Sequence, residues 1–137
     1  MEQEYHFMTF GNDKYINAAN RICEEAKKLN VFHRIKNFNE KELFSYSEFE
    51  QHRDFIYSNP QGFGYWLWKS FLTMKYMETM KDGDILVYAD GGCSINENGR
   101  KRMLEYFEMV NLHPSGVLRF QLSFANQLEE KMELKWI

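Results

Sequence analysis

The chain has 137 residues, the length of one domain, and its apolar fraction of 44% and charged fraction of 27% are those of a globular protein. These proportions exclude disordered, collagen-like and disulfide-framework proteins, and no apolar run approaches the roughly 18 residues that a membrane span needs. The 17 basic and 20 acidic residues give a formal charge of −3, which disfavours a nucleic-acid partner because proteins that bind a phosphate backbone carry a basic excess. Any anionic partner is therefore expected to be small and held by a local site.

The two cysteines, Cys23 and Cys93, are far apart, and neither belongs to a CxxC or Cys/His motif. This spacing disfavours a structural zinc site and indicates reduced thiols. The first ten residues lack the basic and apolar regions of a signal peptide. We therefore expect a cytoplasmic protein.

In chain order, the pattern first predicts a β-α-β unit. Residues 5–10 read as an apolar strand that ends at Gly11, and apolar residues at helical spacing over 15–29 predict a helix capped by Asn12 or Asp13. A second strand is expected over 31–38. Two short helices should follow, each opened by a capping box, at 39–42 and 47–50, with the second ending near residue 58.

The next segment is a glycine loop over 59–64, followed by an apolar stretch over 65–80 that predicts a helix buried on most sides. A turn containing Gly83 should end it, and the unbroken apolar run over 85–89 is typical of a central strand covered on both faces. The remaining patterns predict a helix over 100–110, a strand over 117–124 and a helix over 127–137. Together they predict one α/β domain with a mostly parallel sheet flanked by helices.

The strongest candidate site is the end of the strand over 85–89, where Asp90 enters a turn formed by Gly91 and Gly92. Ligands of open α/β sheets bind beyond the carboxyl ends of the strands. A carboxylate there can hold a divalent cation, and two glycines let a diphosphate approach the backbone. The alternative is an ordinary Asx turn, and the spacing alone does not decide between the two.

Two further segments could contribute to a ligand site. The loop over 59–64 opens a helix in which Tyr65 could stack on a ligand ring and Lys69 could approach an anion, although core packing for the ring and solvent exposure for the amine are the plain alternatives. Thr9, Phe10 and Gly11 end the first strand and would lie near Asp90 if the two strands are parallel neighbours. They could contact a nucleoside or simply form a β-to-α turn.

These segments together resemble a known family. The motifs are Thr9-Phe10-Gly11-Asn12, Asn59-Pro60-x-Gly62-Phe63-Gly64-Tyr65-Trp66-x-Trp68-Lys69 and Gly83-Asp84-Ile85-Leu86-x-Tyr88-x-Asp90-x-Gly92-Cys93-x-Ile95-Asn96. The chain resembles glycosyltransferases of the GT-A type found in bacterial surface-polysaccharide loci and large viruses, over nearly its whole length.

The resemblance implies a single GT-A or Rossmann-like domain over residues 1–137 that transfers a sugar from a nucleotide-sugar donor to a glycan acceptor. It implies a divalent cation, Mn²⁺ or Mg²⁺, bound at Asp90, with Thr9, Phe10 and Gly11 around the nucleoside. Tyr65 and Lys69 would face the donor, and Gly91 and Gly92 would approach its diphosphate. No catalytic residue is assigned.

Three positions depart from the family pattern. Gly92 replaces the second carboxylate of the metal motif, Gln61 replaces a basic residue, and Ser70 replaces a proline. The family's chains continue past residue 137, so we expect this chain to correspond to the N-terminal, donor-binding part of a longer enzyme. The alternative function is a non-catalytic nucleotide-sugar-binding module or a degenerate remnant of such an enzyme. A homo-oligomer is a further expectation, because a terminal helix would leave apolar surface to cover.

Overall fold

The computed structural model describes residues 2–120, and its contacts divide the chain after Lys101 into two units, Met1–Lys101 and Arg102–Ile137. The elements of the first unit are β1 (Tyr5–Phe10), α1 (Ile16–Leu29), β2 (Arg34–Phe38), α2 (Glu40–Ser45), α3 (Ser47–Glu50), α4 (Arg53–Ser58), α5 (Gly62–Tyr65), α6 (Leu67–Met77), β3 (Ile85–Tyr88) and the 3₁₀ helix η1 (Glu97–Gly99). Helix α7 (Arg100–Leu112) crosses the boundary between the units. One domain over residues 1–137 stays a prediction.

The sheet of the first unit is parallel, with the strand order β2-β1-β3. Phe7 of β1 is opposite Ile35 on one side and Val87 on the other. The predicted α/β fold with a parallel sheet is thus confirmed for three strands. The prediction that β3 is the central strand is wrong, because β1 has that place and β3 pairs only with β1 among the described residues. An apolar run indicates that both faces of a strand are covered by helices. It does not indicate whether the strand lies in the middle of the sheet or at its edge.

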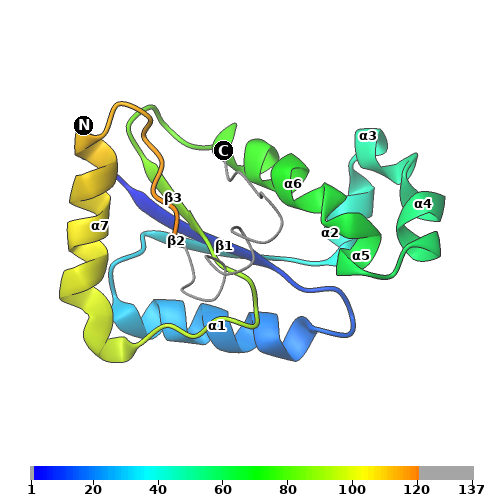
Figure 1. Ribbon diagram of the computed structural model, residues 1–137, viewed down its shortest axis with the longest axis horizontal. Helices are drawn as coiled ribbons and strands as arrows, with labels where there is room; N and C mark the ends of the chain where they lie inside the picture. The colour runs from blue at the N-terminus through cyan, green and yellow to red at the C-terminus, as the bar shows by residue number, and fades with distance from the viewer. Residues whose placement is uncertain (1, 121–137) are drawn as a thin grey trace, which may run out of the picture. The chain divides into compact units, whose positions relative to one another are not determined.

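Helices cover both faces of the sheet, as Figure 1 shows with α1 on one side and α2 to α6 on the other. Successive side chains of a strand point to opposite faces, so β1 supplies both layers. Phe7 packs with Ile22, Cys23 and Ala26 of α1. The larger core on the other face consists of Met8, Phe10, Phe38, Leu43, Phe44, Phe49, Ile56, Trp68, Leu72 and Tyr76.

The helix starts agree with the sequence only in part. The side chain of Asn39 accepts a hydrogen bond from the N–H of Glu42 at 2.9 Å, which confirms the cap of α2. The predicted cap of α1 by Asn12 or Asp13 is wrong, because α1 starts at Ile16 and its N-cap residue is Tyr15, which makes no side-chain cap bond. The second capping box is also wrong, because Ser47 is the first residue of α3 and the residue before it, Tyr46, makes no side-chain cap bond. The helix predicted to run to about residue 58 is split into α3 and α4.

Helix α6 is shorter and less buried than its composition predicts. Trp68, Leu72 and Tyr76 form one buried stripe at four-residue spacing, whereas Met74 and Met77 are about half exposed. Only one face of this helix has the sheet and α2–α4 to pack against. The prediction that it is buried on most sides is wrong, because composition does not reveal how many neighbours a helix has.

The remaining predictions fall in the second part of the chain. The helix predicted over 100–110 is present as α7, with Phe107 buried. Of the strand predicted over 117–124, residues 117–120 have no regular structure and the rest lie outside the described residues. The helix predicted over 127–137 also lies outside them. Among the described helices, none has both the length and the apolar character needed to cross a membrane.

Candidate functional site

A cavity of about 930 Å³ opens at the carboxyl ends of β1 and β3 in the first unit. Its walls come from the segment after β1, the first residue of α2, the end of α4, the residues around α5 and the turn after β3. The chain forms β2 on one side of β1 and β3 on the other, so β1 and β3 flank the point where the strand order reverses. Open α/β sheets bind ligands at this point, so the cavity is where the topology predicts a site.

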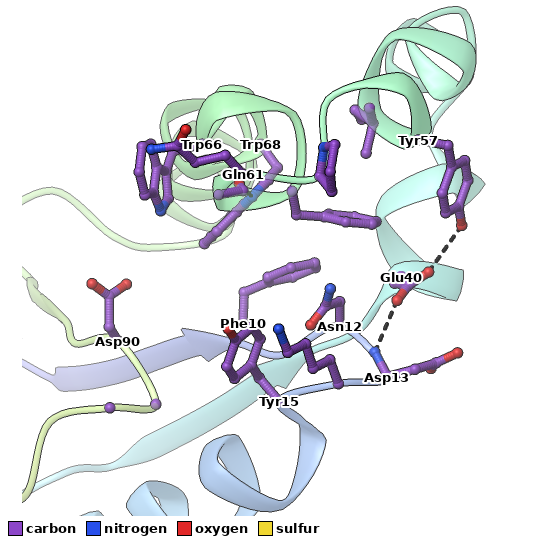
Figure 2. Close-up of a pocket in the computed structure, with 17 residues that line it drawn as sticks. Phe10, Asn12, Asp13, Tyr15, Glu40, Tyr57, Gln61, Trp66, Trp68 and Asp90 are labelled. Carbon is purple, nitrogen blue, oxygen red and sulfur yellow. Dashed lines mark hydrogen bonds between the residues drawn. The ribbon is translucent and has the colours of Figure 1, made fainter.

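Asp90 stands at the rim of the cavity, two residues after β3 (Figure 2). Its carboxylate accepts a hydrogen bond of 2.6 Å from the Tyr88 hydroxyl and lies 3.2 Å from the Lys69 ammonium. The Asp90 side chain is still 56% exposed, so its oxygens remain open to a ligand. Burial, with a smaller contribution from Asp90, raises the pKa of Tyr88 well above its usual value, so Tyr88 remains a neutral donor.

The turn after Asp90 is fixed against helix α1. Gly91 is buried, and a Cβ atom there would lie 3.1 Å from the backbone nitrogen of Ala19. Arg21 donates to the carbonyl oxygens of Gly91 and Cys93 at 2.6 and 2.7 Å. Gly92 lies in open space. Arg21 has no sequence signal as a site residue, because its partners are backbone atoms some 70 positions away.

The end of β1 is tied to the same turn. The Thr9 hydroxyl donates to the carbonyl oxygen of Ala89 at 2.7 Å, and Thr9 is fully buried. Gly11 lies so close to α1 that a Cβ atom would be 2.7 Å from that of Ala19. Phe10 stacks on Trp68 with ring centroids 4.2 Å apart and also lines the cavity. Thr9 and Gly11 therefore shape the cavity without lining it.

Residues Gly62–Trp66 form a left-handed turn beside the cavity. Their φ angles are 59, 50, 79, 53 and 59°, all in the left-handed region. The N–H groups of Tyr65 and Trp66 donate to the carbonyls four residues earlier, both at 2.9 Å. The left-handed helical conformation costs roughly 1–2 kcal/mol for each L-residue that has a Cβ, and strain of this kind often marks functional sites.

The left-handed turn decides which aromatic ring reaches the cavity. Trp66 is 47% exposed and lines it, whereas Tyr65, although 54% exposed, does not line it and faces Phe55 at 6.3 Å between ring centroids. The sequence singled out Tyr65, so Trp66 is a site residue that it missed. The signal that could have found it is the pair of glycines that precede it.

The far wall of the cavity is built around Glu40 (Figure 2). One carboxylate oxygen accepts from the Asp13 N–H at 2.8 Å and the other from the Tyr57 hydroxyl at 2.9 Å. Asn12 lies beside them, and its side-chain oxygen is buried without a hydrogen-bond partner among the described residues. Of these residues, Asn12 alone belongs to the motifs that carry the family resemblance; the sequence pattern predicts Asp13 and Glu40 only in helix caps.

The charged residues that line the cavity are three carboxylates, Asp13, Glu40 and Asp90, and one ammonium, Lys14. Lys69 contacts Asp90 but does not line the cavity. The cavity is therefore net negative and favours cations. Asp90 fits a divalent cation that takes its other ligands from phosphate oxygens and water, because Mg²⁺ typically binds through one or two carboxylates plus substrate phosphates.

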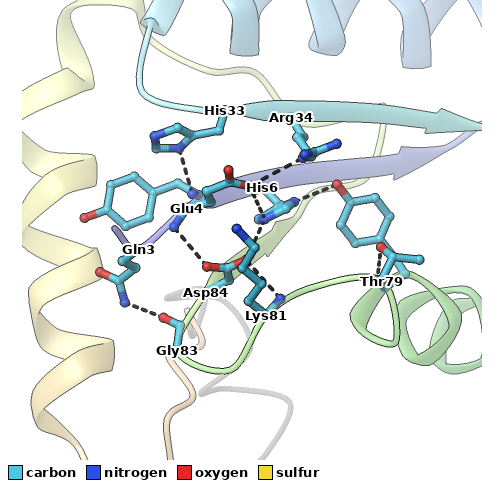
Figure 3. A network of polar contacts seen from close by, with 11 residues as sticks. Gln3, Glu4, His6, His33, Arg34, Thr79, Lys81, Gly83 and Asp84 are labelled. Atoms are coloured by element: carbon cyan, nitrogen blue, oxygen red, sulfur yellow. Dashed lines mark hydrogen bonds and ion pairs between the residues drawn. The ribbon is translucent and has the colours of Figure 1, made fainter. Parts of the chain in front are cut away.

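A second cluster, formed by Glu4, His6 and Asp84, lies at the amino ends of the strands (Figure 3). His6 is buried and bonds Tyr76 through Nδ1 at 2.8 Å and Asp84 through Nε2 at 3.1 Å. The Glu4 N–H, foremost, and the Lys81 N–H donate to Asp84 and lower the pKa of its carboxyl. These hydrogen bonds give the cluster a structural role, because they join β1 to α6 and to the turn before β3.

Four of the predicted site residues line the cavity: Phe10, Asp90, Gly91 and Gly92. The other four, Thr9, Gly11, Tyr65 and Lys69, lie around it without forming its walls. Neither of the two free cysteines is among these predicted site residues; Cys23 is buried and Cys93 is exposed. Burial, as the main cause, raises the pKa of the Cys23 thiol.

Comparison with known proteins finds no relative of this chain. No family model, no curated protein and no solved structure matches the chain.

Proposed function

We propose that the cavity binds a nucleotide sugar and that the chain is a glycosyltransferase of the GT-A type, acting on a glycan acceptor. The single observation that carries this proposal is the cavity at the reversal of strand order, with Asp90 exposed at its rim. Its volume of about 930 Å³ lies in the range of small-molecule and cofactor sites, and its walls combine rings with a few polar groups.

The charge of the cavity argues for a metal-dependent ligand. A bare diphosphate would meet three carboxylates and one ammonium, which repel it on balance. A divalent cation between the diphosphate and Asp90 reverses that balance, and when bound it would stabilise the negative charge of the departing diphosphate. The Tyr88 hydroxyl and the Lys69 ammonium hold the Asp90 carboxylate in place. The expected cofactor is Mn²⁺ or Mg²⁺.

A non-catalytic nucleotide-sugar-binding module is the second candidate function. Glu40 and Asp90 each already bond two protein donors, which makes both poor general bases. Asp13 is exposed and is the remaining carboxylate of the cavity. A donor that binds but is neither transferred nor hydrolysed would favour this second function over the first.

The test is a calorimetric titration with the diphosphates of uridine, guanosine, adenosine and cytidine, each with and without Mn²⁺. We expect at least one of them to bind about tenfold or more tightly with Mn²⁺, a difference of about 1.4 kcal/mol. Asp90→Asn should bring the affinities with and without Mn²⁺ together. Asp82→Asn, an exposed acid in the turn before β3, is the matched control and should keep the Mn²⁺ effect.

Two results would contradict the proposal. If none of the four diphosphates binds under either condition, the cavity is not a nucleotide site. If Asp90→Asn retains the full Mn²⁺ effect, Asp90 does not hold the cation.

A further inference from the structure

The aromatic rings that line the cavity differ in whether they already have a partner. Phe10 stacks on both Phe63 and Trp68, and Tyr57 contacts Phe44 and Phe63. The ammonium of Lys14 lies 5.3 Å from the centre of the Tyr15 ring. The Trp66 indole has no hydrogen bond, aromatic pair or cation–π contact within the described part of the chain, although it is the largest half-exposed ring at the cavity.

The orientation of the indole follows from its contact with Gly62. A Cβ atom on Gly62 would lie 2.5 Å from both Cδ2 and Cε2 of Trp66 and 2.8 Å from Cε3. The bond between Cδ2 and Cε2 is shared by the two fused rings, so an atom closest to it lies over the face of the indole and not at its edge. Trp66 therefore rests one face on the backbone of Gly62, and its other face has no aromatic or cation–π contact with the described residues.

Packing alone does not account for this arrangement. Trp66 has a Cβ and takes the left-handed conformation, at φ 59°, yet half of its side chain is exposed. Phe63 takes the same conformation but is held by three ring contacts, with Phe10, Phe44 and Tyr57. Tyr65 is similarly strained and exposed but does not line the cavity. Trp66 differs from it in combining strain and exposure with a place in the cavity wall, where a bound ligand could supply the missing contact.

We propose that Trp66 is the platform on which the nucleobase of the bound nucleotide stacks, with Gly62 as its support. This inference rests on the proposed nucleotide-binding function and adds the residue that recognises the base. A nucleobase is flat and uncharged and presents a π face, so it matches a supported indole with one free face. Figure 2 shows Trp66 on the α5–α6 segment and Asp90 on the turn after β3, two separate walls of the cavity, so stacking on Trp66 leaves Asp90 to the diphosphate.

The platform is tested by separating the base from the diphosphate. The probes are the nucleoside diphosphate that binds the wild type, with Mn²⁺, and inorganic pyrophosphate with Mn²⁺, both measured by calorimetry. Trp66→Leu removes the flat ring, and Trp66→Phe keeps a smaller one. Tyr65→Leu is the matched control, because Tyr65 lies in the same left-handed turn and is equally exposed but does not line the cavity.

Trp66→Leu should weaken nucleoside diphosphate binding by about 5- to 150-fold, which corresponds to about 1–3 kcal/mol for one stacked base. Pyrophosphate binding should be unchanged, Trp66→Phe should lose less, and Tyr65→Leu should bind as the wild type does. Gly62→Ala, whose methyl group would displace the indole, should resemble Trp66→Leu.

Wild-type affinity of Trp66→Leu for the nucleoside diphosphate would overturn the platform and leave the proposed function standing. An equal loss of pyrophosphate binding would also overturn it, because Trp66 would then act on the cavity as a whole. If the wild type binds no nucleoside diphosphate, the proposed function fails first and the platform fails with it.

Discussion

Substituting alanine for single glycines separates backbone strain from steric overlap in this fold. Gly64 lies in the left-handed turn at φ +79°, and a Cβ atom there would be 2.7 Å from Cγ1 and 3.1 Å from Cα of Ile56. Gly83 has φ +91° with open space around it, and Gly11 has a close neighbour without a left-handed backbone. Gly92 has neither feature. The four positions therefore form a series: one has backbone strain alone, one has steric overlap alone, one has both and one has neither.

The expected losses follow from these distances and angles. Gly83→Ala should lower the free energy of unfolding by about 1–2 kcal/mol, the cost of a left-handed L-residue. Gly11→Ala should cost about 1–3 kcal/mol through overpacking against α1. Gly64→Ala combines both causes and should cost about 2–5 kcal/mol, because the overlap includes backbone of α4. Gly92→Ala should stay within about 0.5 kcal/mol of the wild type.

The measurement is urea unfolding at 25 °C, monitored by far-ultraviolet circular dichroism, with midpoints compared at equal slopes. The reasoning is refuted if Gly64→Ala is no less stable than Gly83→Ala, because the overlap with Ile56 would then cost nothing. It is also refuted if Gly92→Ala loses more than about 1 kcal/mol, since no contact explains such a loss.

Two further predictions concern the opposite ends of the strands. The folded state lowers the pKa of Asp84, so the stability it contributes is present above the unfolded pKa near 3.8 and is lost as pH falls through the folded value. The difference in unfolding free energy between wild type and Asp84→Asn should therefore be largest near neutral pH and shrink below about pH 4. A difference that does not change with pH would contradict the stabilising role of the Asp84 carboxylate. Arg21→Ala frees the carbonyls of Gly91 and Cys93 and should speed amide exchange in that turn, as measured by mass spectrometry. Lys28→Ala on the same helix is the control, and equal exchange in both variants would show that Arg21 does not hold the turn.

Local patterns in the sequence predict much of this fold. The strand over 5–10 is present, and Gly62 and Gly64 take the left-handed conformation that glycine permits, because each of these features depends on residues adjacent in the chain. The cap by Asn39 is likewise a contact over three positions. Local patterns of this kind predict the structure correctly where no contact with a distant part of the chain competes with them.

Other predictions fail where distant contacts compete with local ones. The Asp13 N–H bonds the side chain of Glu40 and α1 begins only at Ile16, so the predicted cap does not form. The apolar segment over 65–80 fills only one face of α6 with core contacts, because within residues 2–101 no further layer packs on its other face. The partner of Asp13 is 27 positions away, and the number of layers around α6 depends on the whole fold, so both are beyond the range of a periodicity argument.

The sequence by itself determined that an acid follows an apolar strand into a glycine turn, and that glycines precede a run of rings. Tertiary structure decided that Trp66 lines the cavity while Tyr65 does not, and that Lys69 pairs with Asp90 outside its walls. The physical reason is that a side chain's direction depends on its backbone conformation and on the element that packs beside it. Five consecutive left-handed residues rotate each ring away from the direction that a helical pattern predicts.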